Sequence, residues 1–159
     1  MTMNIWLMEG LSSQRDIIQG ISAAAEASQQ QISVFASHRH QRNEILSQAD
    51  FALIEPAEDE RRMTFILSTV EQHGIRAIHT GRNARWFEFR RAEIETSGAT
   101  LTTGATRVEM LDLADDKVSF AESMAQRGLP VVPSMRIDST SQLRQLLLDS
   151  PFGDSPLFV

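Results

Sequence analysis

The chain contains no cysteine among its 159 residues. This absence excludes disulfide bonds, thiolate zinc sites and cysteine nucleophiles, and it fits a reducing cytoplasm. Long apolar runs are also missing, because no stretch approaches the roughly 18 residues that a membrane-spanning helix needs. The first residues, MTMNIWLM, lack the basic start and extended apolar core of a secretory signal. We therefore expect a cytoplasmic protein that does not enter a membrane.

Positive charge is scarce as well. The net charge of −6 argues against broad binding to nucleic acid phosphates. Four arginines gather in one short stretch (Arg82, Arg85, Arg90 and Arg91), which is typical of a solvated helix face. Hydrophobic residues make up 42% of the chain and charged residues 23%, close to the averages of globular domains. This composition predicts a packed core and argues against disorder.

Short apolar runs alternate with amphipathic stretches through the first part of the chain. The runs predict strands over residues 4–8, 32–37, 51–55, 75–79 and 99–102. Apolar residues at three-to-four spacing predict helices over residues 14–28, 58–73 and 83–96, with shorter pieces around 45–46 and 106–113. Ser13 with Asp16, and Thr106 with Glu109, match capping boxes. The alternation predicts an α/β fold with a Rossmann-like doubly wound parallel sheet, which binds ligands at the carboxyl ends of its strands.

A second segment begins near residue 114, after a run of acidic residues. Asp115 or Asp116 can cap a helix there, and Gly128 supplies a left-handed end with Pro130 just beyond it. We therefore predict two domains, over residues 1–113 and 114–159.

Further elements are predicted after this helix. A strand over 131–137 is followed by a helix that Ser139 and Gln142 open as a capping box. The run PLFV at 156–159 is typical of the beginning of a strand. An unpaired apolar strand at the end of a chain would be an edge liability, so we expect the sequence to be part of a longer protein.

The second segment resembles the start of an ATP-grasp domain. The resemblance rests on Asp116-Lys117 at the start of a helix, GLPVVP at 128–133, a strand, a helix and PLFV at 156–159. The α/β domain before it is similar to the pre-ATP-grasp domain of relatives of biotin carboxylase and carbamoyl phosphate synthetase. MEGLSSQRD at 8–16 also resembles the ATP-grasp proteins of bacterial tellurite-resistance gene clusters. The order of elements matches over nearly the whole chain, and the specific motif is confined to 116–133.

The resemblance implies an activity for a complete protein. Such an enzyme uses ATP and Mg²⁺ to phosphorylate a carboxylate, and an amine or another nucleophile captures the acyl phosphate. Catalysis of this kind depends on positioning and on neutralising phosphate charge. A second phosphate lysine, the nucleotide clamp and the magnesium ligands would follow Val159, so we expect the fragment itself to be inactive. The implied partners are a small carboxylate and a nucleophile, with no nucleic acid or membrane, and related amino domains often form dimers.

Lys117 is the residue that the resemblance assigns to ATP. Its ammonium, beside the free amides of a helix N-terminus, could meet a nucleotide phosphate. The alternative is a surface lysine paired with Asp115 or Asp116.

Two loops are candidates for the substrate. The first follows the first strand and contains Glu9, Gly10, Ser12 and Ser13, where a doubly wound sheet commonly binds polar ligands. With one glycine it is not a dinucleotide fingerprint, and a plain capped turn is the alternative. The resemblance implies that this loop shapes the acceptor-substrate side.

The second loop follows the fourth strand. Arg82 there could clamp a carboxylate with two hydrogen bonds, or it could be solvated or paired with Glu88. Residues 104–107 form a weaker candidate of the same kind.

Other residues are assigned no chemistry. His38 and His40 lack a third converging metal ligand, which favours surface histidines. The tryptophans and phenylalanines are expected in the core.

A binding module without catalysis is the alternative to a ligase. Glu55-Pro56 ends the third predicted strand, where a receiver domain would need a phosphorylatable aspartate. A flavodoxin-like or Rossmann-like small-molecule binding module stays open, although Leu11-Ser12-Ser13 is a poor version of a flavodoxin phosphate loop.

Overall fold

A computed structural model describes residues 2–10, 13–105, 107–132 and 134–149. The chain divides into two compact units, Met1–Leu111 and Asp112–Val159. The division lies close to the predicted boundary between residues 113 and 114, and the assignment of two domains stays a prediction. Among the described residues, no helix is long and apolar enough to cross a membrane.

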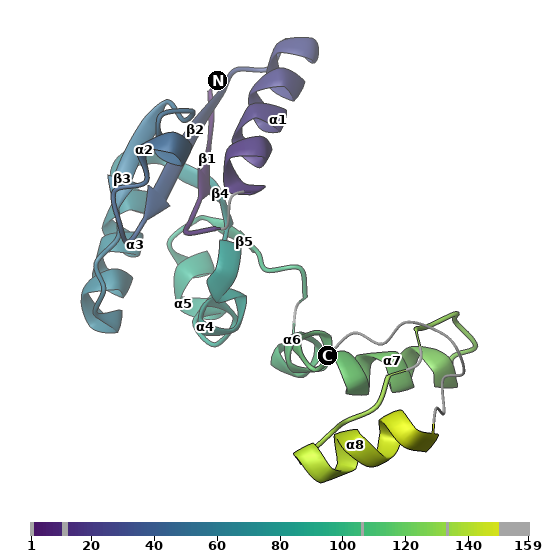
Figure 1. Cartoon of the computed structure of the whole chain (residues 1–159). Coiled ribbons are helices and arrows are strands. Elements are labelled where there is room, and N and C mark those ends of the chain that lie inside the picture. Colours follow the sequence, from purple (N-terminus) through teal and green to yellow (C-terminus); the bar gives the residue numbers. More distant parts are fainter. Residues whose placement is uncertain (1, 11–12, 106, 133, 150–159) are drawn as a thin grey trace. The chain divides into compact units, whose positions relative to one another are not determined.

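The first unit is built on five parallel strands (Figure 1). They are β1 (Met3–Leu7), β2 (Ile32–His38), β3 (Phe51–Ile54), β4 (Ile75–His79) and β5 (Thr100–Thr102). Their order is β3-β2-β1-β4-β5, and every neighbouring pair is parallel. The chain moves outward from β1 to β3 on one side and then returns to place β4 on the other side of β1. The predicted doubly wound sheet is therefore confirmed, with its topological switch between β1 and β4.

Helices cover both faces of this sheet. One face carries α1 (Ser13–Ala27) and α2 (Asn43–Leu46), whose Ile18, Ile45 and Leu46 form a buried cluster with strand residues Leu7, Val34 and Ala36. The other face carries α3 (Asp59–His73), and Figure 1 shows α1 and α3 on opposite sides. Since successive strand side chains point to opposite faces, Trp6 and Phe35 join the α3 cluster while their neighbours join the α1 cluster.

The predicted helix over 83–96 is wrong as a single element. The structure has a short 3₁₀ turn η1 (Gly81–Asn83), then α4 (Ala84–Glu88) and α5 (Arg91–Thr96). Arg90 leaves the helical conformation with φ −114° and ψ 9°, which bends the chain between the two helices. The bend lets Phe87 and Ile94 both reach the core, and it leaves Phe89 64% exposed beside the Arg85 guanidinium. The expectation that the phenylalanines are core is thus wrong for Phe89, and also for Phe51 and Phe120, which are 47% and 42% exposed.

Helix α6 (Val108–Asp115) crosses the division between the units, and the described part of the second unit also contains α7 (Lys117–Gln126) and α8 (Thr140–Asp149). Gly128 follows α7 with φ +74°, which confirms the predicted left-handed end. The Ser139 hydroxyl accepts a hydrogen bond from the Gln142 amide before α8, as its capping box predicted. Thr106 and the predicted strand at 156–159 lie outside the described residues.

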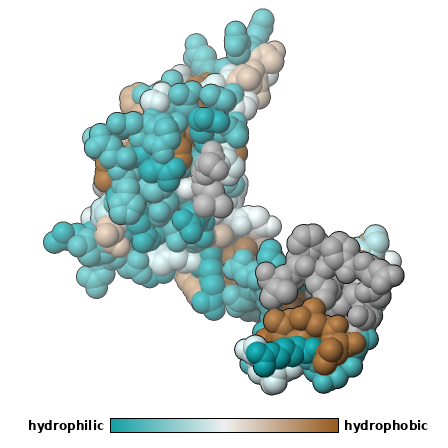
Figure 2. Space-filling model, in the orientation of Figure 1, coloured by the Kyte–Doolittle hydropathy of each residue, from teal (hydrophilic) through white to brown (hydrophobic). Residues whose placement is uncertain are grey.

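The strand predicted over 131–137 is wrong for the described residues of that range, which form no strand. A strand needs a ladder partner, and the described part of this unit contains only helices. None of the described side chains of α6, α7 or α8 is buried. Figure 2 shows hydrophobic side chains at the surface of this unit; the most exposed are Leu129, Val132, Leu147 and Leu148.

Candidate functional site

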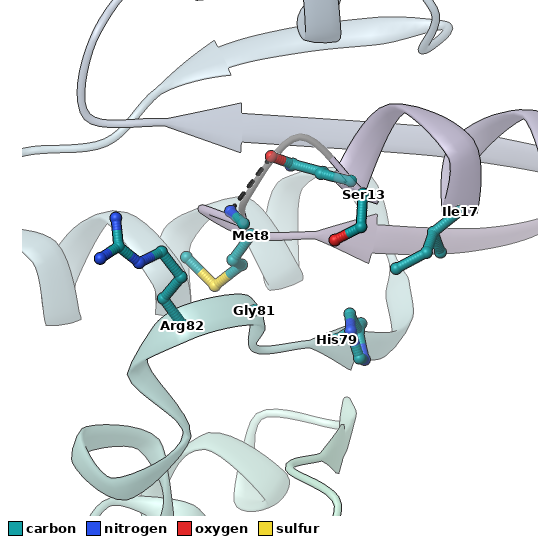
Figure 3. A pocket seen from close by; sticks show the side chains of 8 residues that line it. Met8, Ser13, Ile17, His79, Gly81 and Arg82 are labelled. Atoms are coloured by element: carbon teal, nitrogen blue, oxygen red, sulfur yellow. Dashed lines mark hydrogen bonds between the residues drawn. The ribbon is translucent and has the colours of Figure 1, made fainter. Parts of the chain in front are cut away.

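A pocket of about 220 Å³ lies at the carboxyl ends of β1 and β4, where the strand order reverses (Figure 3). This is where doubly wound sheets bind their ligands. Its lining comes from the end of β1, the first turns of α1 and the β4–η1 connection: Met8, Gly10, Ser13, Gln14, Ile17, His79, Gly81 and Arg82.

The two loops that frame the pocket are joined backbone to backbone. The Met8 amide donates to the His79 carbonyl at 2.9 Å, and the Arg82 amide donates to the Glu9 carbonyl at 2.9 Å. Gly81 lies between these bonds with φ +60°. A Cβ on Gly81 would stand 2.0 Å from the Glu9 carbonyl oxygen, a distance that no side chain can occupy. The loops can approach this closely only because residue 81 is glycine.

A buried polar network holds the loop that follows β1. Glu55 is 2% exposed, and its Oε1 accepts hydrogen bonds from the Glu9 amide at 2.9 Å and the Ser37 hydroxyl at 2.7 Å. The Trp6 indole donates to the same hydroxyl at 2.8 Å. Glu55 Oε2 accepts from Arg62 Nε at 3.0 Å, and Arg62 Nη2 makes an ion-pair contact with it at 2.7 Å. The network thus ties the ends of β1, β2 and β3 to α3.

Arg62 is fully buried and is held by aromatic rings as well as by Glu55. Its guanidinium carbon lies 4.8 Å from the centre of the Trp86 ring and 5.1 Å from that of Phe87. Ring faces attract a cation, and this attraction compensates in part for Nη1, which has no hydrogen-bond acceptor among the described residues. The charge of Arg62 is therefore balanced inside the fold.

The Glu9 carboxylate also interacts with other side chains of the protein. Its Oε2 lies 3.2 Å from Arg39 Nε and accepts from Asn83 Nδ2 at 3.5 Å, while its Oε1 lies 3.8 Å from His38 Nε2. His38 is 5% exposed and accepts a hydrogen bond from the His40 amide, so the expectation of a surface histidine is wrong at this position. The local sequence did not indicate this burial, because Glu9, which lies 3.8 Å from His38, comes from the distant loop after β1. In the described chain no three His, Cys, Asp or Glu side chains could hold a metal ion.

The predicted substrate residues separate into three groups. Gly10, Ser13 and Arg82 line the pocket, whereas the Glu9 side chain is turned to Arg39. Ser12 lies outside the described residues. Figure 3 shows the Arg82 guanidinium extending away from Ile17 and His79, and Glu88, the alternative partner of Arg82, pairs with Arg91 at 2.8 Å instead.

Gln14 is a site residue that the sequence reasoning missed. It is 2% exposed, and its Nε2 donates to the Leu7 and Ser37 carbonyls at 3.1 and 3.3 Å. Its Oε1 accepts from the Gly10 amide at 3.1 Å. One side chain thus joins the ends of β1 and β2 to the loop above them. Its spacing of four from Ile18, on the buried stripe of α1, is the signal that could have found it.

Lys117 is the first residue of α7 and is exposed. Asp116, which precedes it, uses Oδ1 to accept hydrogen bonds from the Val118 and Ser119 amides and uses Oδ2 to pair with Arg136 at 2.6 Å. In the alternative interpretation Lys117 pairs with Asp115 or Asp116, and the structure pairs Asp116 with Arg136 instead. Two of the helix amides that were expected to assist a phosphate are already bound, so a phosphate role depends on the Lys117 ammonium itself.

The cap of α7 should be sensitive to acid. The Ser119 amide and the Arg136 guanidinium lower the pKa of Asp116 from 3.8 to about 2. A lowered carboxylate pKa stabilises the fold fully above 3.8, and the contribution is lost as pH falls through about 2. Asp116→Asn keeps a capping oxygen and should abolish this dependence, as followed by far-ultraviolet circular dichroism. Asp115→Asn is the matched control, and identical acid titrations of the native chain and Asp116→Asn would count against the cap.

No protein-family model and no curated protein matches this chain. Solved structures do match it. The biotin carboxylase domain dimer of Hydrogenobacter thermophilus 2-oxoglutarate carboxylase, in complex with MgADP, ADP and bicarbonate, is 16% identical, with a TM-score of 0.54 over 92% of this chain and 32% of that one. The biotin carboxylase subunit of a pyruvate carboxylase is 20% identical, with a TM-score of 0.52 over 94% of this chain and 33% of that one.

N5-carboxyaminoimidazole synthetase from Staphylococcus aureus is similar as well. It is 14% identical, with a TM-score of 0.56 over 91% of this chain and 35% of that one. This chain has the fold of the amino-terminal part of ATP-grasp enzymes. The predicted resemblance is confirmed at the level of the fold, and the chain spans about a third of the length of these structures.

Proposed function

We propose that this chain is the amino-terminal part of an ATP-dependent carboxylate ligase. In this proposal the complete protein activates a carboxylate as an acyl phosphate, and an amine or another nucleophile then attacks it. The observation that carries the proposal is the match of more than nine tenths of this chain to one third of enzymes whose structures contain ADP or bicarbonate. Residues 1–113 form the pre-ATP-grasp domain, and 114–159 begin the nucleotide-binding domain.

The substrate carboxylate is assigned to the pocket between β1 and β4. Gly10 and Ser13 shape one wall and Arg82 stands at the opposite loop, where its exposed guanidinium has no ion-pair partner in the described part of the chain. Ser12 is proposed with them because it belongs to the same loop. Glu9 contributes through its backbone, which holds Arg82 in place.

Lys117 is assigned to the phosphates of ATP, which act with Mg²⁺ in the complete protein. Its ammonium is exposed, and it is the only lysine in the sequence. The phosphate is proposed to bind the Lys117 ammonium without help from the first helix amides, since Asp116 already accepts hydrogen bonds from two of them. No magnesium ligand is assigned to this chain. The protein is proposed to act in the cytoplasm on small molecules, with a homodimer as one form and without nucleic acid or membrane partners.

Lys117→Ala tests the nucleotide role. In the complete protein the substitution should lower the affinity for ATP about tenfold or more, because a hydrogen bond to a charged group contributes about 1.5–3 kcal/mol. Isothermal titration calorimetry with MgATP measures the change. Arg127→Ala removes another exposed cation just after α7 and should leave the affinity unchanged. Equal affinity of Lys117→Ala and the native protein would remove Lys117 from the site, and a complete protein that binds no ATP at all would favour the binding module without catalysis.

A further inference from the structure

The pocket is larger than a very small anion needs. A dry cavity of about 150 Å³ accommodates benzene, which has six non-hydrogen atoms. By the same ratio, a cavity of about 220 Å³ has room for roughly nine. Bicarbonate, the anion present in two of the similar structures, has four non-hydrogen atoms and would fill about half of this space.

The polar groups around the inner part of the pocket are already used by the protein. The Gly10 amide donates to Gln14 Oε1, and Gln14 Nε2 donates to the Leu7 and Ser37 carbonyls. The Glu9 carbonyl accepts from the Arg82 amide. These described groups already have partners within the protein, so they are not free to bind an anion.

Apolar side chains form much of the remaining wall. Met8 is fully buried at the base, and Ile17 is 39% exposed on the first turns of α1. In Figure 3, Ile17 extends toward His79 from the opposite side of the pocket. An apolar ligand surface that covered Ile17 would remove it from water, which stabilises binding by about 25 cal/mol for each Å² buried, whereas Met8 is already out of water.

Charge is available only at the edge of this apolar region. The Arg82 guanidinium is exposed and extends away from Ile17 and His79, and no described carboxylate pairs with it. The imidazole of His79 has its Nδ1 3.3 Å from the Thr102 hydroxyl, which leaves its other nitrogen for a ligand. The arrangement suits a molecule with an apolar body inside and an anionic group at the mouth.

We infer that this pocket takes a carboxylate of up to about nine non-hydrogen atoms with an apolar body, and that it discriminates against bicarbonate. This inference rests on the proposed function, because it names the class of carboxylate that the ligase would activate. The body packs on Ile17, and Arg82 receives the carboxylate.

Benzoate, which has nine non-hydrogen atoms, is the probe of choice. Titration of the full chain should show benzoate binding at least tenfold more tightly than bicarbonate. Benzamide has the same shape without the charge and should bind more weakly than benzoate. Arg82→Gln should reduce the affinity for benzoate to that for benzamide. Ile17→Ala should weaken benzoate severalfold, whereas Ile54→Ala, which truncates a 52% exposed isoleucine on β3, should not. Both isoleucines are exposed, so neither variant should unfold the chain, and thermal melts check this.

Bicarbonate binding as tightly as benzoate, or benzoate binding that is unchanged in Ile17→Ala, would overturn the inference. The outcomes separate it from the proposed function, because benzoate binding requires no nucleotide. If benzoate binds through Ile17 and Arg82 but the complete protein binds no ATP, the inferred class of ligand is supported and the proposed ligase function is contradicted. An ATP-dependent ligase that prefers bicarbonate in this pocket overturns the ligand class alone.

Discussion

Gly81→Ala is expected to destabilise the first unit by about 2–5 kcal/mol. A non-glycine residue at positive φ costs roughly 1–2 kcal/mol. The new Cβ would also stand 2.0 Å from the Glu9 carbonyl oxygen and 2.8 Å from that of Met8, so the two loops must separate, which adds the cost of overpacking, about 1–3 kcal/mol. Urea unfolding of the full chain measures the loss. The pocket should open at the same time, and benzoate binding should fall.

Gly74→Ala is the matched control for this substitution. Gly74 has φ +58°, against +60° for Gly81, and no atom lies within 4 Å of its added Cβ. Its loss should be limited to the conformational cost of roughly 1–2 kcal/mol. If the two variants lose equal stability, the close contact between the loops does not constrain residue 81, and the described geometry of the pocket is wrong.

Arg62→Met is expected to cost about 3–5 kcal/mol, since it leaves the buried Glu55 carboxylate without its cation. The effect should exceed that of an ordinary surface change because both side chains are fully buried. Glu55→Gln in the Arg62→Met background removes the unpaired charge and keeps an acceptor for the Glu9 amide and the Ser37 hydroxyl. The double variant should therefore be more stable than Arg62→Met alone, as measured by urea unfolding.

Arg61→Met serves as the control for the buried pair. Arg61 is the neighbouring residue, its side chain is 77% exposed, and it lies 3.9 Å from Glu58. An exposed pair of this kind contributes less than about 1 kcal/mol. A loss for Arg62→Met no larger than that for Arg61→Met would show that the network beneath the first loop does not stabilise the fold.

Local patterns were sufficient to predict the sheet. Each strand of the first unit is a short apolar run, and the helices between them carry their own apolar spacing, so element order followed from neighbouring residues. The doubly wound order then followed from the right-handed crossover of parallel strands. The two loops that line the pocket were identified from the sequence for the same reason, since Gly10, Ser13 and Arg82 follow β1 and β4, and their role in binding stays a prediction.

The contacts that hold the pocket were not predictable in the same way. Arg62 lies beside the apolar stripe of α3, and only the folded chain brings Glu55 and the Trp86 ring to it. The sequence shows Gly81 as one glycine after a strand, whereas its necessity comes from the Glu9 carbonyl, which β1 places against it. His38 was wrongly expected at the surface, because its contact with Glu9 from the loop after β1 forms only in the folded chain.

In the second unit the helix ends were predictable from the sequence, but a predicted strand was wrong. The helix ends were predicted from local chemistry, with Asp116 before α7 and Gly128 after it. The strand over 131–137 was predicted from its apolar residues alone, although a strand forms only with a partner. Val132 is 80% exposed in the described structure, so an apolar residue at this position does not indicate a buried strand.

The most direct test of a carboxylate ligase follows one oxygen atom. The complete protein would be supplied with MgATP, ¹⁸O-labelled benzoate and hydroxylamine as the nucleophile. Attack of the carboxylate on the γ-phosphorus forms the acyl phosphate and ADP, and hydroxylamine then displaces phosphate to give benzohydroxamate. The account predicts ADP formation that depends on benzoate, with one ¹⁸O atom in each inorganic phosphate by mass spectrometry. Release of AMP and pyrophosphate, or unlabelled phosphate alone, would contradict it.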